Sequence, residues 1–289
     1  METAAYLRQV VRVLACEIGV RSFQDREHLI MTAGYISGEL ASFGYDVTRQ
    51  TFHYRGHSYD NLIAELPGTS LLESILVIGA HYDTVRTTPG ADDNASGVAG
   101  LLGLARLLSG TRPDKTIRFV FFCLEEPPTY RTKNMGSYHY ARSLKEKKDK
   151  VEGMICLEMI GYFSDQEGSQ HYPVPFMNLK FPWAGSYISM VGNLRSRRFT
   201  REIAEAFRKK TDLPVITLNA PAIVIGIDFS DHWSFGKFGY NALMVTDTAF
   251  YRNPNYHAAS DLPETLDFDR MAKVVEGLAN AATMKECGM

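Results

Sequence analysis

The chain opens with two segments in which hydrophobic residues recur every three or four positions. In the first segment they fall mostly on one face: Tyr6, Leu7, Val10, Val11, Val13 and Leu14. In the second segment the repeat runs through Leu29, Ala33, Ile36, Leu40 and Phe43, and Gly44 follows it. This period indicates amphipathic helices, and a glycine commonly ends a helix. The pattern therefore predicts two helices before residue 45.

The pattern then changes to one typical of strands. Residues 47–53 and 59–66 are predicted to form a hairpin that ends at Pro67-Gly68. A continuous apolar run, typical of a strand buried on both faces, lies at 74–80, and two further strands are predicted at 117–124 and 154–160. Further strands are predicted at 222–227 and 242–246, with one short strand inside a surface excursion over 168–194. Helices are predicted at 94–109, 134–149 and 198–210, and from about Asp267.

The alternation of strands and helices predicts the fold class. An α/β fold is expected, with a mainly parallel, mixed central sheet flanked by helices. No internal repeat or low-complexity linker divides the chain. A single domain over residues 1–289 is therefore the simpler interpretation.

Composition and charge exclude several classes of function. The 31 basic and 33 acidic residues give a net charge of -2, so no positive field is available to hold nucleic acid. Four cysteines are too few for a disulfide scaffold. The N-terminus does not resemble a signal peptide, and no apolar run approaches the roughly 20 residues that cross a bilayer. A cytoplasmic protein without membrane or nucleic-acid partners is expected, although a secreted chain trimmed of its leader would look the same. The oligomeric state stays open.

Side chains that bind metals gather where the predicted strands end. His81 and Asp83 follow the first buried strand, Glu125 and Glu126 follow the second, and Glu158 lies near the end of the third. Two more groups occupy loops: Asp92-Asp93-Asn94 before a predicted helix, and Tyr256-His257 after the last strand. Taken singly, such residues are typical of turns, helix caps and solvated acids.

Together these residues favour a metal site. Ligands of open α/β sheets bind at the carboxyl ends of the strands, where all of these groups converge. Several carboxylates are costly to assemble there without a cation. Nitrogen and oxygen ligands without a thiolate suit zinc in a hydrolytic site, with manganese or cobalt as alternatives.

The order and spacing of these residues resemble the M28 zinc aminopeptidases, which are exopeptidases with two catalytic metal ions. The resemblance covers most of the chain and rests on His81-x-Asp83, Gly90-Ala91-Asp92-Asp93-Asn94-Ala95-Ser96-Gly97, Glu125-Glu126, Glu158, Ser230-Asp231-His232 and Tyr256-His257. Position 158 is the one departure, because the better-known members have Asp there, although Glu also occurs. The resemblance implies the zinc-exopeptidase fold, of the phosphorylase/hydrolase-like type.

The resemblance also implies a ligand set. Two zinc ions are expected, bridged by Asp92. His81 and Glu158 would complete the protein ligands of one ion, and Glu126 and His257 those of the other. Family members often have a cis peptide bond between the two aspartates, which in this sequence are residues 92 and 93.

The same resemblance implies catalytic roles. Asp83 would orient the ring of the ligand His81. Glu125 would act as general base toward a water whose pKa the ions lower, and would then protonate the leaving amine. Tyr256 would steady the oxyanion, unless it is a packing residue. His232 lies in a segment associated with the substrate pocket or is purely structural. The expected substrate is a peptide with a free N-terminus.

Three alternative interpretations share parts of this pattern. Glutaminyl cyclases resemble the fold but are one-metal acyltransferases, which tend to have Ser at position 93 and Trp at position 256. M20 peptidases insert a domain of about a hundred residues between the fourth and fifth ligands, and the 99 residues from 158 to 257 leave no room for one. A non-catalytic binding module is disfavoured because every ligand position is filled. Side-chain preference stays open, since five residues could line a pocket or belong to the core: Trp183, Met190, Phe235, Phe250 and Tyr251.

Overall fold

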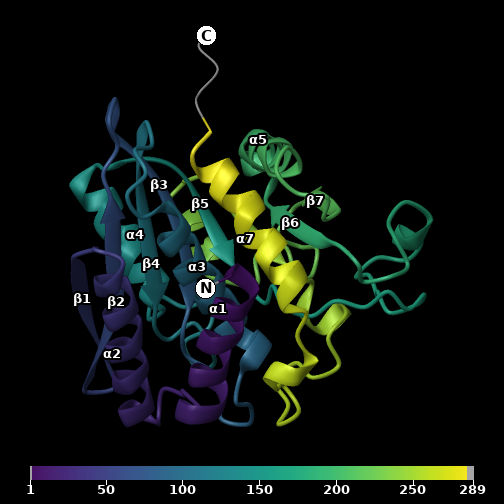
Figure 1. Cartoon of the computed structure of the whole chain (residues 1–289), viewed down its shortest axis with the longest axis horizontal. Coiled ribbons are helices and arrows are strands. Elements are labelled where there is room, and N and C mark those ends of the chain that lie inside the picture. Colours follow the sequence, from purple (N-terminus) through teal and green to yellow (C-terminus); the bar gives the residue numbers. More distant parts are fainter. Residues whose placement is uncertain (1, 285–289) are drawn as a thin grey trace.

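An eight-stranded mixed sheet forms the centre of the computed structural model, which describes residues 2–284 (Figure 1). Its strands are β1 (Val47–Tyr54), β2 (His57–Leu66), β3 (Leu71–His81), β4 (Lys115–Phe122), β5 (Lys150–Leu157), β6 (Ile188–Gly192), β7 (Val215–Asn219) and β8 (Ala242–Thr246). Their order across the sheet is β1-β2-β4-β3-β5-β8-β6-β7.

Strand direction decides where the loops meet. β3 is parallel to both β4 and β5, and β5 is parallel to β8. These four central strands therefore end at the same edge of the sheet. The β1–β2 hairpin and the β6–β8 pair are antiparallel. The predicted α/β class with a mixed, mainly parallel sheet is confirmed.

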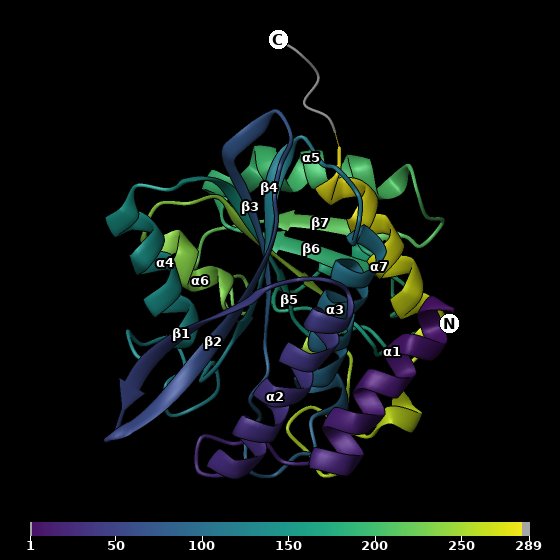
Figure 2. The same cartoon turned by 60° about the vertical axis from the view of Figure 1, so that its left-hand side comes forward.

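Helices cover both faces of the sheet. They are α1 (Thr3–Arg12), α2 (Arg26–Ser42), α3 (Gly97–Leu108), α4 (Gly136–Lys147), α5 (Arg197–Arg208), α6 (His232–Lys237) and α7 (Phe268–Ala282). A large apolar core joins one face to α1, α2, α3, α5 and α7, and a smaller core joins the other face to α4 and α6. Figure 2 shows α4 and α6 on the opposite side of the sheet from α1, α2 and α3. Among the described residues, no helix is long and apolar enough to cross a membrane.

The two ends of the described chain pack together. α1 buries Tyr6, Leu7, Val10 and Val11, and it lies against α3 and α7 (Figure 1). The guanidinium of Arg8 lies 4.4 Å from the centre of the Phe268 ring at the start of α7.

One strand prediction is wrong. The apolar run 222–227 forms turns, and its Ile223 is 88% exposed. The edge strand is instead β7, at 215–219, in a segment for which no element was predicted. The short strand expected within 168–194 is present as β6.

Candidate metal centre and active site

Loops at the carboxyl ends of β3, β4 and β5 bring the expected side chains together. His81 is the last residue of β3, Glu125 and Glu126 follow β4, and Glu158 follows β5 directly. His257 reaches the same place from the loop after β8. His81, Glu125, Glu126 and Glu158 are buried, and His257 is partly exposed.

Two groups of metal-competent atoms share one residue, Asp93. The first group is His81, Asp93 and Glu158, and the second is Asp93, Glu126 and His257; within each group the ligand atoms lie within 4.8 Å of one another. Asp93 Oδ1 is 3.6 Å from Nε2 of His81, and Asp93 Oδ2 is 3.1 Å from Nε2 of His257. One carboxylate therefore presents an oxygen to each group.

The geometry contradicts the prediction that Asp92 bridges two ions. Asp92 lies outside both groups, because its Oδ1 accepts a hydrogen bond from Gly161 N at 3.0 Å and its Oδ2 accepts one from Asn253 Nδ2 at 2.7 Å. The cis peptide bond is likewise one residue later than expected, between Asp93 and Asn94. Neighbouring aspartates in this turn point to different sides, and the sequence alone does not say which one faces the site.

Asp83 holds the glutamate pair from behind. Its Oδ1 accepts a hydrogen bond from the main-chain N–H of Glu125 at 3.0 Å, and its Oδ2 accepts one from Glu126 at 3.1 Å. Asp83 also lies beside His81, as expected. Nδ1 of His81 lies 3.1 Å from the main-chain oxygen of Asp83 and 3.5 Å from its carboxylate Oδ1. The carboxylate therefore mainly fixes the loop that carries the glutamates.

Glu125 and Glu126 face different partners. Glu126 Oε2 lies 3.5 Å from His257 Nε2, whereas Glu125 belongs to neither group and its Oε2 lies 4.0 Å from His81 Nε2. Burial and the neighbouring acids, Glu126 and Glu158 among them, raise the pKa of Glu125 well above its usual range. Burial and Asp93 raise the pKa of Glu126 to about 7. A carboxylate with a raised pKa beside two groups of ligands is suited to accept a proton.

Glu158 is held at two points. Its Oε2 lies 3.1 Å from His81 Nε2 and accepts a hydrogen bond from the hydroxyl of Ser230 at 2.6 Å. Ser230 Oγ in turn lies 3.2 Å from the buried Cys156 Sγ. Ser230 belongs to the Ser-Asp-His motif of the sequence. The motif did not predict that Ser230 would hold Glu158 in place.

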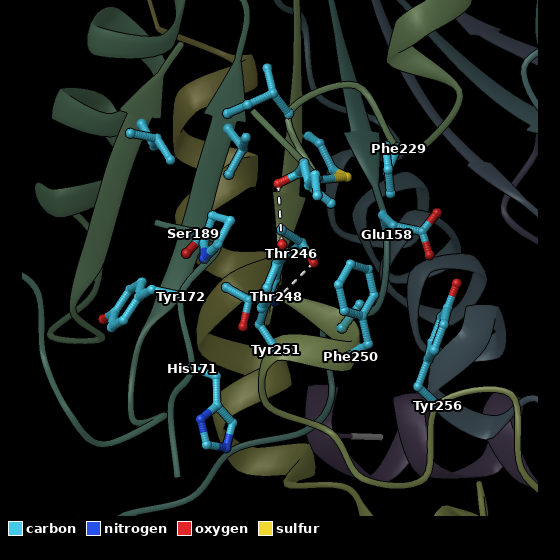
Figure 3. A pocket seen from close by; sticks show the side chains of 18 of the residues that line it. Glu158, His171, Tyr172, Ser189, Phe229, Thr246, Thr248, Phe250, Tyr251 and Tyr256 are labelled. Carbon is cyan, nitrogen blue, oxygen red and sulfur yellow. Dashed lines mark hydrogen bonds between the residues drawn. The ribbon is translucent and has the colours of Figure 1, made fainter. Parts of the chain in front are cut away.

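Tyr256 lies against His257. Their rings stack with centroids 3.8 Å apart and an interplanar angle of 19°. Burial and the surrounding carboxylates, Asp93 first among them, raise the pKa of the Tyr256 phenol. The phenol therefore keeps its proton and can donate it in a hydrogen bond. Figure 3 shows the hydroxyl pointing toward the carboxylate of Glu158.

A cavity of about 220 Å³ opens beside these groups. Acidic groups that include Glu125, Glu126 and Glu158 form one end, and the remaining walls are mostly apolar. Phe250 and Tyr251, for which the sequence left open a place in a pocket or in the core, line this cavity. In Figure 3 they lie between Glu158 and Tyr172.

The other candidate pocket residues lie elsewhere. Phe235 and Met190 are in the two cores, and Trp183 is half-exposed and not among the lining residues. His232 is buried, with Nε2 2.8 Å from the main-chain oxygen of Ile227, which fits a structural role.

One supporting residue escaped the sequence analysis. The buried Asp261 accepts hydrogen bonds from the main-chain N–H groups of Asp92 at 2.9 Å and Asp93 at 3.1 Å. It holds the aspartate pair as Asp83 holds the glutamate pair. No periodicity or motif marks a residue that binds main-chain atoms, so no sequence signal pointed to Asp261.

Comparison with known proteins defines the class. The sequence model of peptidase family M28 matches residues 61–282, and the chain belongs to this family. It is therefore a peptidase, a hydrolase of a family that contains zinc aminopeptidases.

Individual relatives support this assignment. The protein YfbL of Escherichia coli K12 is 40% identical over 280 residues, which cover 94% of this chain and 85% of YfbL. A probable leucine aminopeptidase of Trichophyton verrucosum is 29% identical, and the match covers 79% of this chain but 57% of that protein.

Solved structures share the fold at low sequence identity. BSAP, a zinc aminopeptidase from Bacillus subtilis, superposes with a TM-score of 0.77 at 17% identity, covering 99% of this chain and 96% of BSAP. A glutaminyl cyclase from Bacteroides thetaiotaomicron gives a TM-score of 0.72 at 20% identity, covering 98% of both chains. The fold alone therefore does not distinguish a peptidase from a cyclase.

Proposed function

We propose that this protein is an aminopeptidase that uses two zinc ions, held by His81, Asp93 and Glu158 on one side and by Asp93, Glu126 and His257 on the other. The observation that carries the proposal is the placement of Asp93, whose two carboxylate oxygens face different histidines. A carboxylate shared between two ligand groups suits a pair of neighbouring ions.

The donor set fits zinc. Two ligand atoms about 2.1 Å from a tetrahedral ion lie about 3.4 Å apart. The distances from the histidine nitrogens to the carboxylate oxygens within the two groups run from 3.1 to 3.6 Å. Glu126 Oε1 is also buried and makes no hydrogen bond, which leaves it available to an ion. Manganese or cobalt would suit the same nitrogen and oxygen donors.

The chain's own residues supply the proton transfers. Bound zinc would polarise the scissile carbonyl and lower the pKa of the attacking water. Glu125, which belongs to neither ligand group, takes the proton from that water and delivers it to the leaving amine. The protonated phenol of Tyr256 donates a hydrogen bond to the carbonyl oxygen as it gains negative charge. Asp83 keeps Glu125 in place through the main-chain N–H.

The cavity supports a substrate with a free N-terminus. No lysine or arginine is found among its described lining residues, whereas four carboxylates line it: Asp93, Glu125, Glu126 and Glu158. With zinc bound, the ligand carboxylates are neutralised, but Glu125 stays uncoordinated and no lysine or arginine of the described lining repels an ammonium group or pairs with an acidic one. The apolar walls suit a large hydrophobic N-terminal side chain, because a cavity of 150 Å³ already accommodates benzene and this one is about 220 Å³.

Metal content and two matched aspartate variants test the proposal. The purified protein should bind two equivalents of zinc, hydrolyse leucine p-nitroanilide and lose that activity with a chelator. Asp93→Asn should lose zinc, whereas Asp92→Asn should keep both ions, because the Asp92 carboxylate belongs to neither ligand group and accepts hydrogen bonds from Gly161 and Asn253. Full activity without metal, or zinc loss confined to the Asp92 variant, would overturn it.

Two further substrates separate the alternatives. N-acetyl-leucine p-nitroanilide should be resisted, because it lacks the ammonium group. A glutaminyl peptide should lose its N-terminal glutamine by hydrolysis; release of ammonia with formation of a pyroglutamyl product would indicate a cyclase instead.

A further inference from the structure

Arg21 is buried beside the metal centre, in a segment that precedes the family-matched residues 61–282. Its exposed fraction is 0%. A guanidinium has five N–H donors and no acceptor, so burial requires several acceptors around it. Arg21 finds main-chain oxygens only: those of Leu14, Gly19, Tyr82, Pro89 and Gly90, at 2.8 to 3.0 Å.

Three of these oxygens belong to the loops that carry the ligands. Tyr82 directly follows the ligand His81, and its oxygen accepts from Arg21 Nε at 3.0 Å. The oxygens of Pro89 and Gly90 accept from Nη1 and Nη2 at 2.8 and 2.9 Å, shortly before Asp93. A single side chain thus ties the loop after β3 to the turn that leads into α3.

The main chain of Arg21 strengthens the same contact. Its N–H donates to the hydroxyl of Thr84 at 2.9 Å, and its oxygen accepts from the N–H of Thr84 at 3.3 Å. Gly90 permits the close approach, because its φ is +64° and a Cβ there would lie 3.0 Å from Arg21 Nη2 and overlap the oxygen of Asp93.

The direct partners of Arg21 are neutral main-chain oxygens, so its positive charge is left to balance nearby carboxylates. Burial lowers the pKa of Arg21 to about 10, and the negative charges of Asp261, Asp93, Asp83 and Glu126 oppose that shift. Asp83 and Asp261 are the carboxylates that hold the glutamate pair and the aspartate pair. Buried carboxylates in this number need positive charge nearby even before a metal binds.

We propose that Arg21 is a positioning residue of the metal centre: it fixes the loops that carry His81 and Asp93, and its charge balances the carboxylates behind them. The N-terminal segment is therefore part of the active site although it contributes no ligand. This inference rests on the two-zinc proposal above, but it concerns how tightly zinc is bound and not whether it is bound.

The test compares two buried arginines. Arg21→Lys keeps the charge, but one ammonium cannot reach the oxygens of Tyr82, Pro89 and Gly90 together. Arg252 is the control, since it is also buried and binds the main-chain oxygens of Tyr162 and Tyr187 and the side-chain oxygen of Gln170, none of which belongs to a residue that directly precedes a ligand. Kd for zinc is measured by chelator competition on each full-length variant, alongside its metal-free Tm.

Arg21→Lys should weaken zinc binding about 10- to 100-fold, the usual effect of removing a group that orients metal ligands. At saturating zinc its KM should equal that of the wild type, because Arg21 contacts no substrate. Arg252→Lys should lower Tm but leave Kd for zinc unchanged. If Arg21→Lys does not fold, Thr84→Val, which removes the acceptor for the Arg21 N–H, should weaken zinc binding in the same direction.

Two results would overturn the inference. One is an unchanged Kd for zinc in Arg21→Lys, or in Thr84→Val if Arg21→Lys does not fold. The other is an equal loss of zinc affinity in Arg252→Lys. The zinc stoichiometry of the wild type separates this failure from failure of the proposed function. A wild-type chain that binds no zinc refutes the proposed function, whereas two equivalents with an unaffected Arg21 variant refute only the role of Arg21.

Discussion

Replacing Asp83 by asparagine tests how the glutamate pair is held. Each oxygen of the Asp83 carboxylate accepts one main-chain N–H, from Glu125 or from Glu126. Asparagine has one acceptor oxygen and one NH₂ group, so one of these two amides must face another donor. Losing a hydrogen bond to a charged group costs about 1.5–3 kcal/mol, and a buried N–H without a partner costs about 1–3 kcal/mol.

These two costs overlap, so the free energy of unfolding of the metal-free protein should fall by about 2–4 kcal/mol. For 289 residues the entropy of unfolding is about 0.6 kcal/mol per kelvin. Tm should therefore fall by about 3–7 °C in calorimetry. Because the loop also positions a zinc ligand, zinc affinity should drop about 10- to 100-fold.

Asp60→Asn is the control for this experiment. The Asp60 carboxylate accepts hydrogen bonds from Arg49 and Thr51 on the exposed β1–β2 hairpin. Its replacement should change the free energy of unfolding by no more than about 0.5 kcal/mol. A metal-free Asp83→Asn protein with the Tm of the Asp60→Asn control would refute the argument that both amides depend on this carboxylate.

Three further predictions concern rate, protons and the pocket. Glu125→Gln should keep both zinc ions and lower kcat about 10²–10⁴-fold with little change in KM, whereas Glu126→Gln should lose zinc first; the opposite pattern would exchange their roles. Burial lowers the pKa of His257, but Asp93 and Glu126 outweigh it and raise the pKa to about 10, so the metal-free ring is protonated near pH 7.5 and zinc must displace that proton. Zinc affinity should therefore fall as pH falls, and titration calorimetry in buffers of different ionisation enthalpy should show proton release; zero release would contradict this. Ser189 is buried in the cavity wall, so Ser189→Leu should reduce hydrolysis of phenylalanyl p-nitroanilide more than of alanyl p-nitroanilide. An equal loss for both substrates would show that the cavity does not select the N-terminal side chain.

The sequence predicted the central sheet well because its strands are buried on both faces. The second halves of β3, β4 and β5 are strongly apolar, and the polar residues that follow them lie at one edge. The run 222–227 is equally apolar for a different reason. Ile225 and Ile227 line the cavity next to the metal centre, so this segment is apolar without being a strand.

The ligand residues were predictable by type and spacing, but their directions were not. Asp92 and Asp93 have the same side chain, and only the turn decides which carboxylate faces the histidines. Arg21 and Asp261 were not predictable either. Their partners are main-chain oxygens and N–H groups, which every residue has, so no pairing of side-chain types reveals them.

The packing of α1 against α7 has a consequence for synthesis of the chain. α1 leaves the ribosome before the other described elements, and Phe268 follows Arg12 by 256 residues. At 5–20 residues per second, α1 waits roughly 13–50 s for α7, one of the two helices against which it lies. During that time the nascent chain exposes Leu7, Val10 and Val11, which are fully buried in the finished protein. Ribosome-bound chains truncated before α7 should therefore be bound by chaperones that recognise exposed apolar segments, and chains that include α7 should be released.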